Sequence, residues 1–150
     1  MSRLTGAEDD VVSRLWLAIL FLFAAGLAVG WYALFHGYFD HGHFEIKQVQ
    51  WCSTNQVAML AERWDDEALG GLDYYVLVGS HLFTATELRH AYYSNAVVFS
   101  AMSTCLELHW DGPNRLIIKC NSSTVSRDDI NVQRRQIGSI AVSYENIALR

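Results

Sequence analysis

A run of 25 residues without Asp, Glu, Lys or Arg, from Leu15 to Phe39, constrains this chain more than any other feature. Its first part, LWLAILFLFAAGLAVGWYALF, is almost wholly apolar. About 20 apolar residues in a helix, at 1.5 Å per residue, cross a hydrocarbon core of roughly 30 Å. We therefore predict a transmembrane helix over residues 15–36, preceded by a tail over residues 1–14.

A cleaved signal peptide is the rival interpretation of this run. The small residues Ala28 and Gly30 would then form an A-x-G cleavage site. Against it, the segment before the run holds three acidic residues and two arginines, which is a poor charge pattern for a signal peptide. Aromatic residues also stand where interfacial belts belong, at Trp16 and Trp31. We favour a retained membrane anchor.

Positive charges beside the run predict its orientation. Arg3, Arg14 and the α-amino group precede it, whereas Lys47 is the one cation that follows before Arg63. The excess of positive charge stays inside, so we place the N-terminus in the cytoplasm, the helix in the inner (cytoplasmic) membrane and the larger part in the periplasm or another extracytoplasmic space. All three cysteines lie in that exported part, which an oxidising compartment would hold.

Histidines are dense immediately after the run, in FHGYFDHGHFEIK. His36, His41 and His43 surround Asp40, a composition that raises the question of a metal site. Metal sites hold three or four ligands in a fixed geometry, and the two glycines here interrupt the candidate pairs. We interpret residues 37–43 as a juxtamembrane link at the water interface. A link of about seven residues keeps the following domain close to the bilayer.

The exported part carries nine Lys or Arg and thirteen Asp or Glu, so it is mildly acidic and a nucleic-acid partner is not expected. It contains no nucleophile elbow, phosphate loop, dinucleotide fingerprint or HExxH motif. We expect no catalytic residue, metal or cofactor, and hence no enzyme. Glu87-x-x-His90 has the spacing of one di-iron ligand pair, but a capping box with Thr84 explains Glu87 better.

Hydrophobic patterns predict an α/β beginning. Strands are expected at 44–51 and 72–79, and a helix at 84–95 starts with the capping box. Between the strands, residues 53–71 predict a helix capped by Ser53 or Thr54 and ended by Gly70-Gly71. Its apolar residues would share one face: Val57, Leu60, Ala61, Trp64 and Ala68.

The later half is richer in strand signals. LELHW (106–110) and RLIIKC (115–120) flank the turn DGPN, and residues 139–145 alternate between apolar and polar. The polar segment 121–136 is interpreted as an excursion between strands. We therefore predict an exported α+β domain over residues 44–150, a small, mostly antiparallel sheet of four to six strands with two helices packed on one face.

The hairpin register decides whether two cysteines can pair. A turn centred on Gly112-Pro113 sets Cys105 opposite Cys120, within disulfide range. A shift by one residue gives a better apolar face and pairs Glu107 with Lys119, but we expect it to separate the cysteines. A bulge would reconcile the two registers. Both outcomes, a Cys105–Cys120 disulfide and two buried thiols, stay open.

Small residues in the apolar run suggest a helix–helix contact. Gly26 and Gly30 form GxxxG, and Ala24 and Ala28 repeat the spacing, which we expect to give a broad small-residue stripe. With the exported domain, this predicts a non-enzymatic single-pass accessory or assembly subunit of an envelope complex. Its partner would be another membrane or extracytoplasmic protein, or a second copy in a homo-oligomer. The alternative is a membrane-anchored immunity protein or inhibitor of an extracytoplasmic protein.

Overall fold

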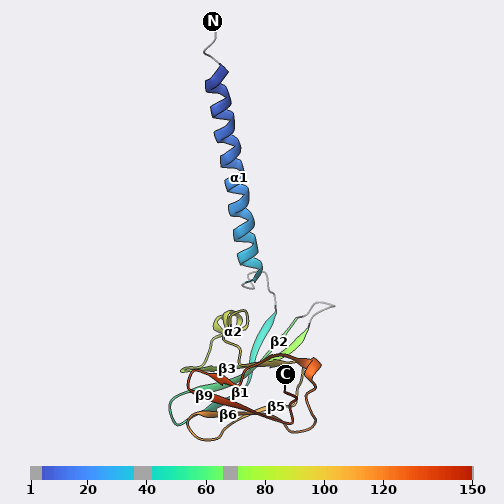
Figure 1. Ribbon diagram of the computed structural model, residues 1–150. Helices are drawn as coiled ribbons and strands as arrows, with labels where there is room; N and C mark the ends of the chain where they lie inside the picture. The colour runs from blue at the N-terminus through green and yellow to red at the C-terminus, as the bar shows by residue number, and fades with distance from the viewer. Residues whose placement is uncertain (1–4, 36–41, 66–70, 150) are drawn as a thin grey trace. The chain divides into compact units, whose positions relative to one another are not determined.

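The computed structural model describes residues 5–35, 42–65 and 71–149, with side chains in residues 14–33, 42–65 and 71–149. The chain divides into two compact units after residue 39. The first contains the helix α1, and the second contains nine strands and the helix α2 within its described residues (Figure 1). The α+β class predicted from the sequence is confirmed.

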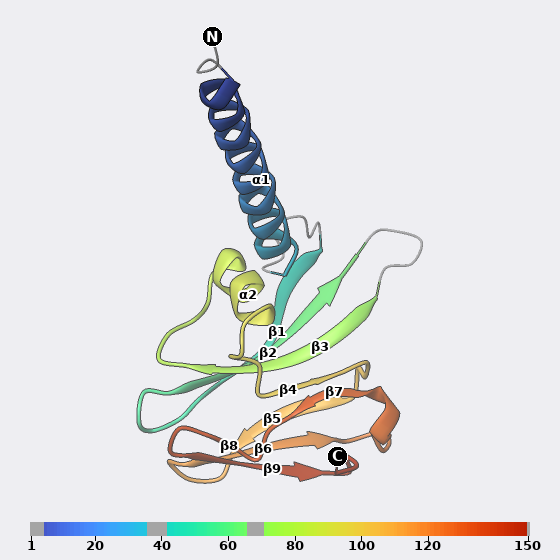
Figure 2. The same cartoon turned by 45° about the horizontal axis from the view of Figure 1, so that its top comes forward.

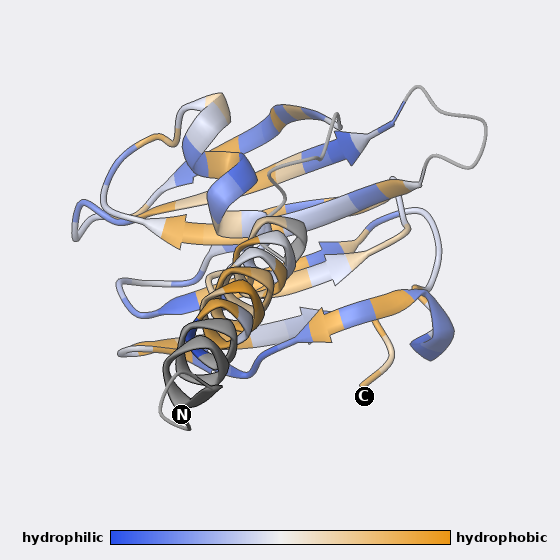
Figure 3. Cartoon of the chain, turned by 90° about the horizontal axis from the view of Figure 1, so that it is seen from above, coloured by the Kyte–Doolittle hydropathy of each residue, from blue (hydrophilic) through white to orange (hydrophobic). Residues whose placement is uncertain are grey.

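Helix α1 (Thr5–Phe35) starts ten residues before the predicted span. Its segment Arg14–Ala33 is 20 residues long, and none of these residues is buried within the protein. At 1.5 Å per residue it measures about 30 Å, the thickness of a hydrocarbon core. Figure 3 shows the apolar colour of this segment. Its length and composition fit both a membrane anchor and a signal sequence.

The second unit contains two sheets. Sheet A has five antiparallel strands in the order β1-β2-β3-β4-β7: β1 (His43–Trp51), β2 (Val57–Trp64), β3 (Leu72–Gly79), β4 (Phe99–Ala101) and β7 (Ile130–Gln133). Sheet B has four strands in the order β5-β6-β9-β8: β5 (Leu106–Trp110), β6 (Arg115–Cys120), β9 (Ile140–Glu145) and β8 (Gln136–Ile137). The β6–β9 pair is parallel and the others are antiparallel. A 3-10 turn, η1 (Arg127–Asp129), precedes β7.

Sheet A is the middle layer of this unit. Helix α2 (Ala85–Tyr92) lies on one side of β1, β2 and β3, and sheet B lies on the other side (Figure 2). The layer between the sheets buries a cluster that includes Leu60, Val76, Phe99, Leu116 and Ile118. The layer between sheet A and α2 buries a second cluster that includes Val57, Met59, Tyr75, Leu77 and Leu88. The centre of sheet A is therefore covered on both faces.

The predicted helix over 53–71 is wrong, because residues 57–64 form strand β2. Residues 57–61 are all buried: Ala58 and Leu60 face sheet B, while the alternate residues of the strand face α2. A strand buried on both faces shows no polar alternation, so its apolar spacing also matches a helix. Ser53 and Thr54 lie in the β1–β2 turn. The predicted helix residue Ala68 and the terminator Gly70 fall outside the described residues.

The remaining element predictions differ in outcome. Strands at 44–51, 72–79, 106–110 and 115–120 and the 139–145 alternation match β1, β3, β5, β6 and β9, and the capping-box helix is α2. The predicted single sheet is two sheets, and α2 is the one α-helix packed on them in the described part of the chain. The 121–136 segment is not a plain excursion, because it contains η1, β7 and the first residue of β8. There, Ile130 packs between the sheets and Val132 packs on the α2 side.

A side-chain amide joins the edges of the two sheets. Gln48 of β1 accepts from the backbone N–H of Leu108 (2.9 Å) and donates to the carbonyl of Leu108 (3.2 Å). Trp110 Nε1 donates to the carbonyl of Gln50 at 2.9 Å. Edge strands carry backbone groups that need partners, and here side chains of the facing edge provide them. The sandwich is therefore closed along β1 and β5.

We expect Gln48→Ala to lower the free energy of unfolding by about 1–3 kcal/mol, because it removes both bonds to a part-buried backbone unit. Urea unfolding of the protein in detergent, followed by tryptophan fluorescence, measures this change. The matched control is Gln50→Ala on the same strand, which keeps its backbone bond to Trp110 and should change stability by less than about 0.5 kcal/mol. Equal losses in both variants would contradict the role assigned to Gln48.

Candidate functional site

The small residues of α1 lie on two faces. Apart from the adjoining backbone of the helix itself, no atom of the described residues lies within 4 Å of an ideal Cβ at Gly26 or Gly30, so both are accessible from outside the helix. Ala24 and Ala28 are each two positions from a glycine, which turns them about 200° around the axis at 3.6 residues per turn. The expected broad stripe is therefore wrong: the glycine pair and the alanine pair form separate faces.

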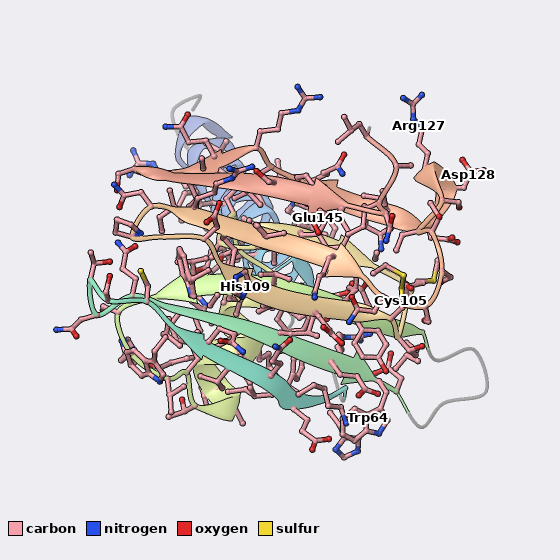
Figure 4. All side chains as sticks on the ribbon, turned by 90° about the horizontal axis from the view of Figure 1, so that it is seen from below. Trp64, Cys105, His109, Arg127, Asp128 and Glu145 are labelled. Carbon is pink, nitrogen blue, oxygen red and sulfur yellow. A yellow bond between two sulfur atoms is a disulfide. The ribbon has the colours of Figure 1, made fainter. Side chains whose placement is uncertain are left out.

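Cys105 and Cys120 have their sulfur atoms at disulfide-bonding distance, with Cα atoms 4.9 Å apart, and the bond is yellow in Figure 4. The β5–β6 register is nevertheless the amphipathic one, with Leu106 opposite Cys120 and Glu107 opposite Lys119. Our expectation that this register separates the cysteines is wrong. Cys105 lies in the turn before β5, outside the ladder, so the strand geometry does not fix the direction of its side chain. The third cysteine, Cys52, is a buried thiol.

The histidines and acidic residues do not form a metal-binding group within the described residues. His36 and His41 lie outside those residues, and His43 stacks on Trp64 with ring centroids 5.3 Å apart. The capping box is confirmed, since Glu87 accepts from the backbone N–H of Thr84 at 2.7 Å. That N–H, and then the His81 ring 3.1 Å away, lower the pKa of Glu87 to about 2.

Aromatic rings and arginines gather where β1, β2, β3 and α2 meet. We name Phe44, Arg63, Arg89, Tyr75 and Tyr92 the aromatic–arginine cluster. Phe44 contacts the guanidinium carbons of Arg63 and Arg89, at 6.0 and 5.7 Å from its centroid. Arg63 also lies 5.4 Å from the ring of Tyr92. Tyr92 in turn packs edge-on against Tyr75, with centroids 5.0 Å apart. Cation–π contacts of this kind contribute about 0.5–2 kcal/mol each.

A hollow of about 300 Å³ lies beside this cluster, lined by Gly42, His43, Phe44, Ala85, Thr86 and Arg89. Arg89 is partly exposed and donates only a long bond, 3.5 Å, to the carbonyl of Gly42. Among the described residues it forms no ion pair with a carboxylate. Its guanidinium is therefore held by an aromatic ring and keeps donors for another group.

A second hollow of about 270 Å³ opens between the C-terminal end of α2 and strands β3, β4 and β7. It is lined by Asp73, Tyr92, Ser94, Asn95, Val97, Ser100, Asn131, Val132 and Arg134. Asp73 is 7% exposed and Ser100 is 3% exposed. The hydroxyl of Ser100 donates to Asp73 Oδ2 at 2.9 Å, and the phenol of Tyr92 donates to the same atom at 3.0 Å. We name this hollow the Asp73 pocket.

The Tyr92–Asp73 bond joins α2 to β3, the middle strand of sheet A, and the Ser100–Asp73 bond joins β4 to β3. Burial, and then the negative charge of Asp73, raise the pKa of Tyr92 well above its usual range, so the phenol stays a donor. The sequence alone did not lead us to single out Asp73. The available signal was one carboxylate inside the otherwise apolar run LDYYVLVG.

Comparisons with protein-family models, with curated proteins and with solved structures find no match to this chain. The chemistry of the site therefore rests on its own residues.

Among the sequence-predicted residues, the structure brings together Cys105 with Cys120. Arg63, Arg89 and the buried carboxylate of Asp73 are polar groups on the side of sheet A that α2 covers. We call this side the α2 face.

Mass spectrometry should show a Cys105–Cys120 disulfide. Digestion without reductant is expected to give a peptide pair that links these two residues. A thiol reagent in denaturant should label Cys52 alone, and all three cysteines only after reduction. A loop of this length contributes about 3 kcal/mol to the free energy of unfolding, so Cys105→Ser with Cys120→Ser should lose that amount. Labelling of three thiols without reductant would contradict the bond.

Proposed function

We propose that this protein is a non-enzymatic single-pass membrane protein that binds another protein, as an accessory or assembly subunit of an envelope complex. The exported unit and the membrane helix would each provide a contact surface. The observation that carries this proposal is the aromatic–arginine cluster on the α2 face of sheet A. The Arg14–Ala33 segment of α1 supports the membrane part.

Composition and contacts of the cluster favour protein binding. Interface cores are enriched in Tyr, Trp, Phe and Arg, and these residues dominate the energetic hot spots. Arg89 stacks on Phe44 and keeps guanidinium donors that a carboxylate of a partner would accept. Stacking also limits the rotamer freedom of the arginine, which lowers the entropic cost of binding. An acidic side chain of the partner therefore fits the hollow beside Arg89.

In this proposal the N-terminus is in the cytoplasm and α1 is in the inner (cytoplasmic) membrane. The second unit is in the periplasm or another extracytoplasmic space. Arg3 and Arg14 before the span support this orientation, and a Cys105–Cys120 bond is typical of an oxidising compartment.

A reporter enzyme that is active only outside the cytoplasm, fused after Arg150, should be active, because the second unit is exported. The mature chain should keep Met1 or Ser2 at its N-terminus, which N-terminal sequencing measures. A mature chain that begins at Trp31 would identify the apolar segment as a cleaved signal peptide and contradict the anchor.

Gly26→Leu with Gly30→Leu should abolish co-purification of the protein with its membrane partner, or its self-association, from detergent-solubilised membranes. Close approach of two backbones over small residues drives association in lipid, and two leucines prevent it. The matched control is Ala24→Leu with Ala28→Leu, the same change on the other face of α1, which should leave co-purification intact. Membrane insertion, measured by carbonate extraction, should be normal for both variants.

The reverse pattern, with loss only in the alanine variant, would move the contact to the Ala24–Ala28 face. Intact co-purification in both variants, together with full binding by the protein without its anchor, would contradict the role of α1. That result would favour the membrane-anchored immunity protein or inhibitor, whose action needs the exported unit alone.

A further inference from the structure

Asp73 is a buried carboxylate that forms no ion pair with another described residue. Its side chain lies at the base of the Asp73 pocket, and within the described part of the chain no Lys, Arg or His forms an ion pair with it. Arg63 stands opposite Asp73 in the β2–β3 ladder, but its guanidinium pairs with Asp65 at 2.9 Å. The side-chain groups that donate directly to Asp73 in the described part of the chain are the hydroxyls of Ser100 and Tyr92, and Arg63 lies on the ring of Tyr92.

This arrangement is costly for the folded protein on its own. Transfer of an ion from water to the interior costs several kcal/mol even after relaxation, so buried carboxylates are usually paired with a cation or bound to a metal. An ionised carboxylate can accept about four hydrogen bonds. The hydroxyls of Ser100 and Tyr92 use part of this capacity. Both the charge and the remaining acceptor sites suit a positively charged donor.

The same pocket also contains a positive charge, the guanidinium of Arg134. Arg134 lines it, is partly exposed, and donates to the side-chain oxygen of Asn95 at 3.2 Å. Among the described residues Arg134, like Asp73, forms no ion pair. The pocket therefore offers one buried anion and one cation nearer the solvent. Its volume of about 270 Å³ would hold on the order of nine water molecules.

We infer that the Asp73 pocket binds a small zwitterion of the size of a free amino acid, with its ammonium group on Asp73 and its carboxylate on Arg134. A divalent metal fits less well, because three His, Cys, Asp or Glu side chains do not converge here or elsewhere among the described residues. The ammonium group would form a direct ion pair with Asp73 and would supply up to three donors. The guanidinium would hold the carboxylate with two parallel hydrogen bonds. This site adjoins the protein contact proposed above and shares Tyr92 with it.

Isothermal titration calorimetry of the full-length protein in detergent micelles tests the inference. The probes are L-alanine and L-serine, with ethylamine as the ammonium half and propionate as the carboxylate half. L-alanine or L-serine should bind, and each half ligand should bind at least about tenfold more weakly, since one charge contact is worth roughly 1.4 kcal/mol or more. Absence of binding by both amino acids, or equal binding by propionate, would overturn the proposal.

Variants assign the two charges. Asp73→Asn should abolish binding of both the amino acid and ethylamine. Arg134→Gln should weaken amino-acid binding about tenfold, to the level of ethylamine, and leave ethylamine unchanged. Arg135→Gln, the exposed neighbour, is the matched control and should bind as wild type. If Asp73→Asn fails to fold, the comparison of Arg134→Gln with Arg135→Gln decides whether the amino acid binds in the pocket. Unchanged binding by folded Asp73→Asn, or equal losses in both arginine variants, would contradict the assignment.

Discussion

The burial of sheet A on both faces is the constraint on which the rest of this structure depends. Strands β2 and β3 place alternate side chains against sheet B and against α2, and the middle of each strand is taken out of water. Apolar residues satisfy this requirement at nearly every position. Asp73 is the exception, because it enters the same environment with a charge. Its hydroxyl partners and its pocket follow from that position in the sheet.

The short length of α2 determines which parts of sheet A lie beside the helix and not beneath it. Eight residues cover only part of sheet A, so the ends of its strands emerge beside the helix. Phe44, Arg63 and Arg89 belong to the aromatic–arginine cluster, and the Asp73 pocket opens at the C-terminal end of α2, where Arg134 also lines it. Tyr92 belongs to both, because its ring stacks with Arg63 while its phenol bonds to Asp73. The cluster and the pocket therefore share one residue of α2.

Local signals were enough to predict the elements that have one exposed face or a defined start. Alternation predicted β9, the turn DGPN predicted β5 and β6, and the capping box of Thr84 and Glu87 predicted α2. Strand β2 was mistaken for a helix because burial on both faces removes the alternation. Strand β7 was missed because a short edge strand in a polar segment has little pattern. Asp73 and the arginine stacking depend on contacts across the sheet, which sequence spacing does not encode.

The central claim is that the α2 face of sheet A is the binding surface of an exported, membrane-anchored unit. Site-specific photo-crosslinking in native membranes tests it most directly, with a photoreactive amino acid in place of Arg89 in one protein and of Glu145 in another. Glu145 is exposed on β9 of sheet B, labelled in Figure 4. The account predicts a protein adduct from position 89 and none from position 145. An adduct from position 145 alone would contradict it.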